Sequence, residues 1–492
     1  MDKIYNEIAE DFREISNLES ISSQLSWDNA VMMPKNGITR RSKEITLINK
    51  IIHNSYNKKN YMDMIGSINF ENLDQWQQAN IRSIKHILSH NVIIPEQLNN
   101  NFIESGINCE YIWRSAKSSN DFNSFAKALT PVINYLREIA LIKSEEFSSS
   151  KYDALLDYYE PGLKEDDFKP IFQNLAKTLP NLIDQVIRKQ GKKTDFSSLK
   201  FPIEKQKLIV KRFTQLLGLS SDDIRIDESA HPFCTGSLGD VRITTRYSEA
   251  EFLTSLFGII HESGHAIYDL NTPKQFQFDP VGGCLGMAIH ESQSLFYEMQ
   301  IATSRDFIEI AHKIISKEFN IKNSIFTADN LFKFLNHVEK KYIRVDSDEI
   351  TYPLHIIMRY EIEKKLINGE IEVNDLPEIW EYYLKNFFDL DYQNHSNGCM
   401  QDIHWTDGSI GYFPCYSLGA IIASQLKHKF DQENPNFKLA ENNISKFQEF
   451  LTDNVHKYGR LKDASSLSTF LFDSKYDDKI YVNYLNKKYL NE

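Results

Sequence analysis

Apolar residues recur every three to four positions through most of residues 1–200 of this chain. A clear example is "FKPIFQNLAKTLPNLIDQVIRKQ", where Phe168, Ile171, Leu175 and Leu179 share one side of a helix. Glycine and proline, which end helices, number only 19 and 14 among 492 residues. The pattern therefore predicts a protein built mainly from amphipathic helices.

The pattern changes between His231 and Tyr247. The segment "HPFCTGSLGDVRITTRY" has small turn residues followed by alternating β-branched residues, which predicts a short strand or hairpin. The helical pattern then resumes almost to Glu492. We expect an all-α fold with a small β element near the active site. The chain should form one domain over residues 1–492, with an N-terminal helical half (1–200) and a catalytic metal-binding half (201–492).

Charge and cysteine usage narrow the classes of partner and compartment. The net charge is −12 and no strong basic cluster occurs, which argues against binding nucleic acid or an anionic membrane. The apolar run Leu418–Ala423 is far shorter than the roughly 20 residues of a membrane span. The N-terminal segment lacks the apolar core of a secretory signal. The five cysteines form no CxxC pair, so we expect a cytoplasmic protein.

The segment "IIHESGHAIYDL" contains the most informative motif. His261 and His265 lie four residues apart, and Glu262 directly follows the first histidine. A capping box at "SEAEF" predicts a helix from about Ser248 to Asp269, on which both imidazoles would face the same side. This is the pattern of a catalytic zinc site.

A catalytic zinc ion needs a third protein ligand and leaves a fourth position for water. The best candidate is Glu291 in "AIHESQSLFYEMQ", which is 26 residues after His265 and on a second predicted helix. The adjacent His290 would point about 100° away, so the two should not ligate together. Asp269 is either a residue that orients an imidazole or an ordinary exposed acid. Glu262 would act as the general base for the water bound to the ion.

Five ordered segments carry a resemblance, which further stretches extend from Leu25 to the C-terminal "YLNKKYL". The five segments are "HPF", "DVRIT", "HESGH", "HESQ" and "GCMQDIHW". In this set the chain resembles the carboxypeptidase Taq family of metallocarboxypeptidases, with Met400 where leucine is commoner. The resemblance implies a cytosolic homodimer with a deep cleft and a nearly all-helical fold related to neurolysin-type peptidases. It also implies that zinc, or alternatively cobalt, supports the removal of single C-terminal amino acids with broad specificity.

The resemblance also implies a residue that reads the C-terminal carboxylate. Arg344 in "YIRVDSDE" matches the family's carboxylate-binding arginine, and a guanidinium fork suits that task. The alternative is a surface arginine paired with Asp346 or Asp348. Arg359 is a competitor, although Glu363 offers it a simple ion pair one helical turn away.

Four further residues are candidates for contacts with the substrate or the reaction intermediate. His231 and His404 could donate hydrogen bonds to the developing oxyanion, or could be structural. Tyr412 or Tyr416 in "GYFPCY" could supply a phenolic donor, although most tyrosines only pack. The leading hypothesis is thus a zinc carboxypeptidase acting on peptides. The alternatives are a related helical oligoendopeptidase or dipeptidase, and a helical scaffold with a vestigial metal site.

Overall fold

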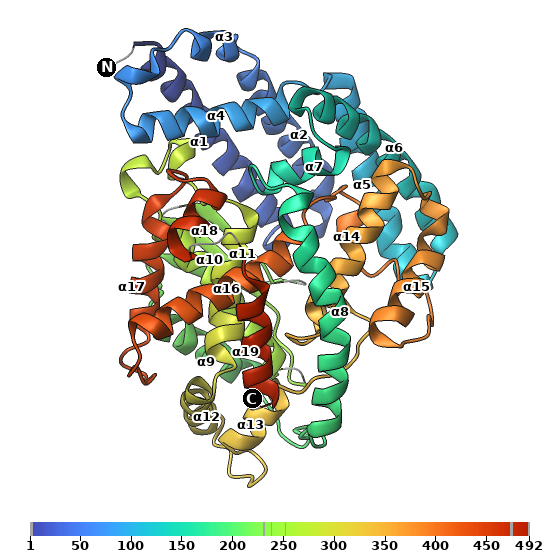
Figure 1. Ribbon diagram of the computed structural model, residues 1–492, viewed down its shortest axis with the longest axis vertical. Helices are drawn as coiled ribbons and strands as arrows, with labels where there is room; N and C mark the ends of the chain where they lie inside the picture. Colours follow the sequence, from blue (N-terminus) through green and yellow to red (C-terminus); the bar gives the residue numbers. More distant parts are fainter. Residues whose placement is uncertain (1–2, 230–231, 238, 251, 473–475, 491–492) are drawn as a thin grey trace.

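The computed structural model describes residues 3–229, 232–237, 239–250, 252–472 and 476–490. Helices dominate it, with α1, α3 and α4 at one end of the molecule and α12 and α13 at the other (Figure 1). The α-helices are Lys3–Val31 (α1), Ile38–Tyr56 (α2), Tyr61–Gly66 (α3), Gln75–Asn91 (α4), Glu96–Ser119 (α5), Phe122–Phe147 (α6), Lys151–Tyr159 (α7), Glu165–Lys189 (α8), Ile203–Leu216 (α9), Phe252–Leu270 (α10), Met287–Leu295 (α11), Arg305–Phe319 (α12), Ala328–Leu335 (α13), Tyr352–Asn368 (α14), Leu376–Phe388 (α15), Pro414–Glu433 (α16), Ser445–Asn454 (α17), Ala464–Phe472 (α18) and Asp478–Leu490 (α19).

Helix α8 shows why this sequence forms helices. Phe168, Leu175 and Leu179 lie on its buried side, as the periodicity predicts. Acidic residues occupy its first turn and basic residues its last turn, which stabilises the helix dipole at both ends. Local charge and apolar spacing therefore favour the same structure.

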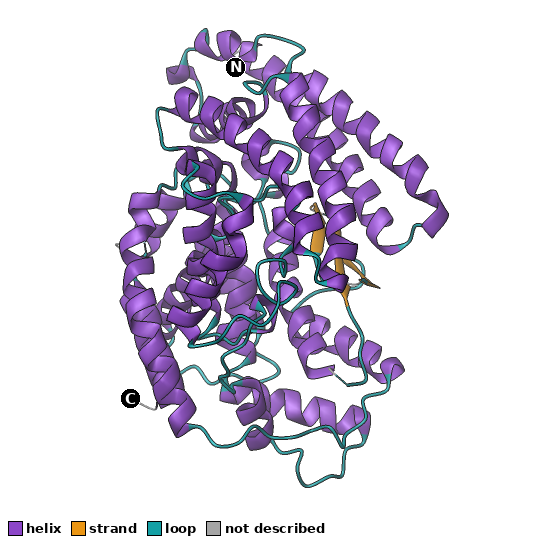
Figure 2. Ribbon diagram, turned by 90° about the vertical axis from the view of Figure 1, so that its right-hand side faces the viewer, coloured by secondary structure: helices purple, strands orange, loops and turns teal. Residues whose placement is uncertain are grey.

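The β element is a three-stranded sheet of Ile224–Glu228 (β1), Cys234–Ser237 (β2) and Asp240–Thr245 (β3), in the order β1-β3-β2. Strands β2 and β3 pair antiparallel and form the expected hairpin, with Thr235 opposite Arg242. Strand β1 pairs parallel to β3 and precedes the segment in which we expected strands. Figure 2 shows the small sheet in orange among the helices. His231 lies outside the described residues, so its predicted role has no structural account.

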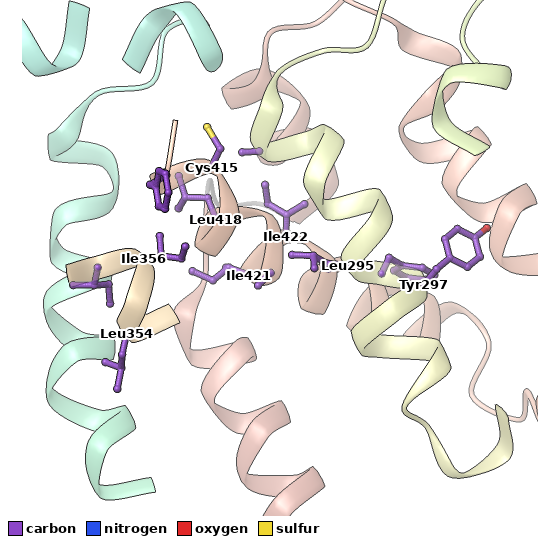
Figure 3. Close-up of a cluster of buried hydrophobic side chains, with 14 of the residues drawn as sticks. Leu295, Tyr297, Leu354, Ile356, Cys415, Leu418, Ile421 and Ile422 are labelled. Carbon is purple, nitrogen blue, oxygen red and sulfur yellow. The ribbon is translucent and has the colours of Figure 1, made fainter. Parts of the chain in front are cut away.

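The main hydrophobic core fixes the helices that carry the site. A separate cluster forms from residues between Tyr5 and Leu88, whereas the large core draws on residues from Cys109 to Leu490. In Figure 3, Leu418 and Ile422 of α16 lie between Leu295 at the end of α11 and the side chains of α14. These helices therefore share one packed interior.

The prediction of an all-α fold with a small β element is confirmed. Within its described part, the chain has no helix with the length and apolarity needed to cross a membrane.

Candidate active site

Helix α10 carries the first two candidate ligands. It spans Phe252–Leu270, close to the range predicted from the sequence, and places His261 and His265 one turn apart with ring centroids separated by 5.0 Å. Ile259 and Ile260 are buried at 0% and 1% exposure and anchor the helix in the core. The apolar side of α10 thus fixes where the two imidazoles point.

Glu291 on α11 faces this histidine pair. Its Oε2 atom lies 4.0 Å from Nε2 of His261 and 3.6 Å from Nε2 of His265. Around a tetrahedral zinc ion with bonds of about 2.0–2.1 Å, ligand atoms are about 3.3 Å apart. The side chain of Glu291 is only 7% exposed, and no described residue donates a hydrogen bond to its carboxylate. The two imidazoles and the buried carboxylate therefore fit a divalent ion, and their donor atoms lie within 4.8 Å of one another.

The neighbouring His290 points elsewhere. Its ring stacks on the ring of His265 at 4.4 Å, and its Nε2 atom lies 3.3 Å from Oδ1 of Asp269. The same oxygen of Asp269 accepts from the thiol of Cys284 at 3.0 Å. Asp269 therefore orients His290 and not His261 or His265. We call His261, His265 and Glu291 the metal group.

Glu298 contacts one imidazole of the metal group, and it was not predicted from the sequence. Its Oε2 atom lies 2.7 Å from Nδ1 of His261, on the side of the ring opposite the metal-facing nitrogen. It lies in a π-helical turn, Phe296–Ala302, that continues α11. Burial lowers the pKa of His261, but attraction from Glu291 and Glu298 outweighs this effect and raises that pKa to about 10. The available signal was the spacing of seven residues from Glu291, which is about two helical turns.

We expect the Glu298→Gln variant to bind zinc about 10- to 100-fold more weakly, because a carboxylate that holds a ligating imidazole also raises its basicity. Competition with a chromophoric chelator measures this dissociation constant. At saturating zinc the rate of peptide hydrolysis should be nearly normal, since Glu298 contacts the nitrogen of His261 that faces away from the ion. An unchanged dissociation constant would show that Glu298 plays no part in holding the ion.

Gly264, inside the motif, allows α10 and α11 to approach closely. A Cβ atom at this position would lie 2.5 Å from Cα of Ser294 and 2.7 Å from the carbonyl oxygen of Gln293. Gly419 of α16 plays a similar part, because a Cβ atom there would lie 2.9 Å from Cβ of Glu291. The distance between Glu291 and the histidine pair thus depends on two glycines.

The Gly264→Ala variant should therefore be destabilised by about 1–3 kcal/mol and bind zinc more weakly, because α11 must move away. Thermal unfolding and zinc titration measure the two effects. Gly258→Ala on the same helix is the matched control, since its Cβ atom would meet only Cγ of Pro232 at 3.7 Å. Equal behaviour of the two variants would contradict the close-approach argument.

Glu262 lies beside the metal group and is only 7% exposed. Burial raises the pKa of its carboxyl group to about 7, and the charge of His261 partly opposes this shift. A carboxylate with a pKa near neutrality can both accept and return a proton. This is the property that a general base and later proton donor requires.

Arg344 is buried beside the site and is not a surface residue. It begins the short 3₁₀ helix Arg344–Asp346, is 8% exposed, and donates from Nε and Nη2 to Oδ1 of Asp402 at 3.2 and 3.0 Å. Its guanidinium also lies over the rings of Phe413 and Tyr416, 5.1 and 5.2 Å from their centroids. Asp402, rather than Asp346 or Asp348, is thus its partner.

Arg359 occupies a different environment. Its Nε donates to Glu363 at 2.8 Å, as the spacing predicts, and both side chains are buried. Its Nη1 also reaches Oδ2 of Asp402 at 3.4 Å. Burial would raise the pKa of Asp402, but the two arginines hold it at about 2. Asp402 therefore remains ionised and fixes Arg344.

The remaining candidates gather on and near α16. The rings of Tyr412 and Tyr416 are 4.9 Å apart, and the ring of His404 stacks on Tyr412 at 6.1 Å. Burial lowers the pKa of His404 to about 4, so it is neutral near pH 7 and keeps one N–H donor. Tyr412 and His290 line a cleft of about 1320 Å³ that extends towards α1 and α4. The structure thus brings the described candidate residues together in one region of the molecule.

Known proteins are similar to this chain over nearly its whole length. Residues 7–489 match the carboxypeptidase Taq (M32) metallopeptidase family. Carboxypeptidase 1 of Bacillus subtilis (strain 168) is 33% identical over 485 residues, which cover 97% of this chain and 96% of that protein. Thermostable carboxypeptidase 1 of Pyrococcus furiosus is 30% identical over 494 residues, covering 97% of each. The solved structure of Trypanosoma cruzi metallocarboxypeptidase 1 superposes with a TM-score of 0.94 at 31% identity and covers 99% of both chains. The chain therefore belongs to the carboxypeptidase Taq (M32) family and is a metallocarboxypeptidase.

Proposed function

We propose that this protein is a zinc-dependent carboxypeptidase that releases single amino acids from the C-termini of peptides with broad specificity. The observation that carries the proposal is the convergence of His261, His265 and Glu291 beside the buried base Glu262. Two imidazoles and one carboxylate are a donor set typical of catalytic zinc, and cobalt accepts the same ligands.

When bound, the ion supplies a Lewis acid for the scissile carbonyl and lowers the pKa of a water molecule. Glu262 takes the proton from the attacking water and returns it to the leaving amine. His404, Tyr412 and Tyr416 are the described donors proposed to face the developing oxyanion or the substrate terminus. His231 is a further candidate on sequence grounds.

Arg344 is the group proposed to select the C-terminal carboxylate. Its Nε and Nη2 are engaged by Asp402, and no described residue bonds to Nη1. A fixed cation near Glu291 lowers the free energy of a bound carboxylate and thereby distinguishes a terminal residue from an internal one. This geometry favours an exopeptidase over an endopeptidase.

The wider setting is proposed on the family resemblance and the sequence. We propose that residues 1–492 act as one domain, with an N-terminal half over 1–200 and a catalytic half over 201–492. We also propose that the protein works as a cytoplasmic homodimer.

A pair of peptides tests the proposal. The zinc-loaded enzyme should release single residues from a peptide with a free C-terminus and leave its amidated twin intact. A chelator should abolish this activity and added zinc should restore it. Equal cleavage of the amidated peptide would instead favour a related oligopeptidase, whereas activity without any divalent ion would overturn the role of the metal.

A further inference from the structure

A second cluster of metal-binding side chains lies on the N-terminal side of the cleft. His86 and His90 lie one turn apart on α4, and Asp157 lies near the end of α7. Their ligand atoms all lie within 4.8 Å of one another. We call these three residues the α4–α7 cluster, and it shares no residue with the active site.

Both imidazoles point at the same carboxylate oxygen. Oδ2 of Asp157 lies 3.0 Å from Nε2 of His86 and 2.9 Å from Nε2 of His90. The backbone carbonyl of Asp157 lies 2.8 Å from Nε2 of His86. Ligand atoms around a tetrahedral zinc ion are about 3.3 Å apart. Each Nε2 atom would therefore have to move only a few tenths of an ångström away from Oδ2 for an ion to bind. The geometry is therefore close to that of a bound state.

The other oxygen of Asp157 is already fixed. Oδ1 accepts the backbone N–H of Gly162 at 2.7 Å, which orients the carboxylate and leaves Oδ2 for the two imidazoles. Both oxygens of the Asp157 carboxylate thus face nitrogen atoms, and Oδ2 is the oxygen placed to bind an ion together with the two imidazoles.

The far side of His90 contacts Lys143. Nδ1 of His90 lies 3.0 Å from Nζ of Lys143, which itself lies over the ring of Tyr158. Lys143 therefore holds the ring of His90 from the side opposite Asp157.

The α4–α7 cluster is accessible to an ion. The side chains of His86 and Asp157 are 23% and 27% exposed, whereas that of His90 is 1% exposed. His86 and His90 both line the same cleft that Tyr412 lines. An ion can thus approach through the cleft and meet two partly exposed ligands, His86 and Asp157, and one buried ligand, His90.

We propose that His86, His90 and Asp157 form a second binding site for a divalent transition metal of the zinc class, which links α4 to α7. On binding, the proton on Nε2 of each histidine moves to Nδ1, each Nε2 becomes a ligand, and the ammonium group of Lys143 moves off Nδ1 of His90.

The test is the zinc content of the full-length protein, measured by equilibrium dialysis and elemental analysis at fixed free zinc. We expect two zinc ions per chain in the parent protein. Asp157→Asn, which preserves the shape of the side chain, should hold one ion. The double variant His261→Ala/His265→Ala should also hold one, at the α4–α7 cluster. A parent protein that holds a single ion, lost in the double variant, would overturn the second site and leave the proposed function intact.

Cobalt gives an independent readout. The double variant loaded with Co²⁺ should show the intense visible absorption of tetrahedral coordination, and adding Asp157→Asn should remove it. Absorption that survives Asp157→Asn would place the ion elsewhere and overturn the proposal.

Discussion

Glu262→Gln should keep its zinc and lose at least about a thousandfold in kcat, because glutamine cannot accept the proton of the attacking water or return it to the leaving amine. Glutamine has nearly the same volume, so the packing of α10 should not change. The buried position of Glu262 beside His261, and the raised pKa of its carboxyl group, are the structural grounds for this effect. Steady-state kinetics with zinc analysis of the same sample measures both quantities.

Glu298→Gln is the matched control, since it makes the same chemical change on the other side of His261. The two variants should behave differently. Glu262→Gln should have a lower kcat with its zinc retained, whereas Glu298→Gln should have a lower zinc affinity with a normal kcat at saturating zinc. If Glu262→Gln retained a tenth of the parent rate, the proton would have another acceptor and the proposed mechanism would be wrong.

Arg344→Met should lower kcat/KM by at least about a hundredfold for peptides with a free C-terminus, mainly by raising KM. Removing one partner of a buried charge contact typically costs about 2–5 kcal/mol of binding. Hydrolysis of amidated peptides, already slow, should hardly change. Comparing the two peptides for parent and variant isolates the contribution of the carboxylate.

Arg359→Met is the control for damage to the buried ion network. Both arginines contact Asp402, so both variants leave this carboxylate with one arginine instead of two and lower the stability of the fold. Only Arg344→Met should reduce the preference for a free carboxylate over an amide. The same loss of preference in both variants would assign it to distortion around Asp402 rather than to Arg344.

Local sequence patterns were sufficient to predict the helical fold and the orientation of the histidine pair. The helix around His261 has its own apolar side and its own spacing, so neighbouring residues determine where both imidazoles point. Glu291 was predicted as the third ligand because a catalytic zinc ion requires one, and it is an acid on the next predicted helix. Both inferences depend on short-range periodicity.

Contacts between distant segments could not be predicted in the same way. Asp402 meets Arg344 across 58 residues, and no periodicity links the two. The parallel pairing of β1 with β3 likewise depends on a crossover rather than a turn. The position of Glu298 depends on a π-helical turn, for which the sequence offers no signal beyond the seven-residue spacing from Glu291. Such features arise from tertiary packing.

The most direct test is a crystal structure of the zinc-loaded protein with diffraction data collected on both sides of the zinc absorption edge. The account predicts an anomalous peak about 2.0–2.2 Å from Nε2 of His261, Nε2 of His265 and a carboxylate oxygen of Glu291. A peak bound by the two histidines but far from Glu291, or no peak between them, would contradict it.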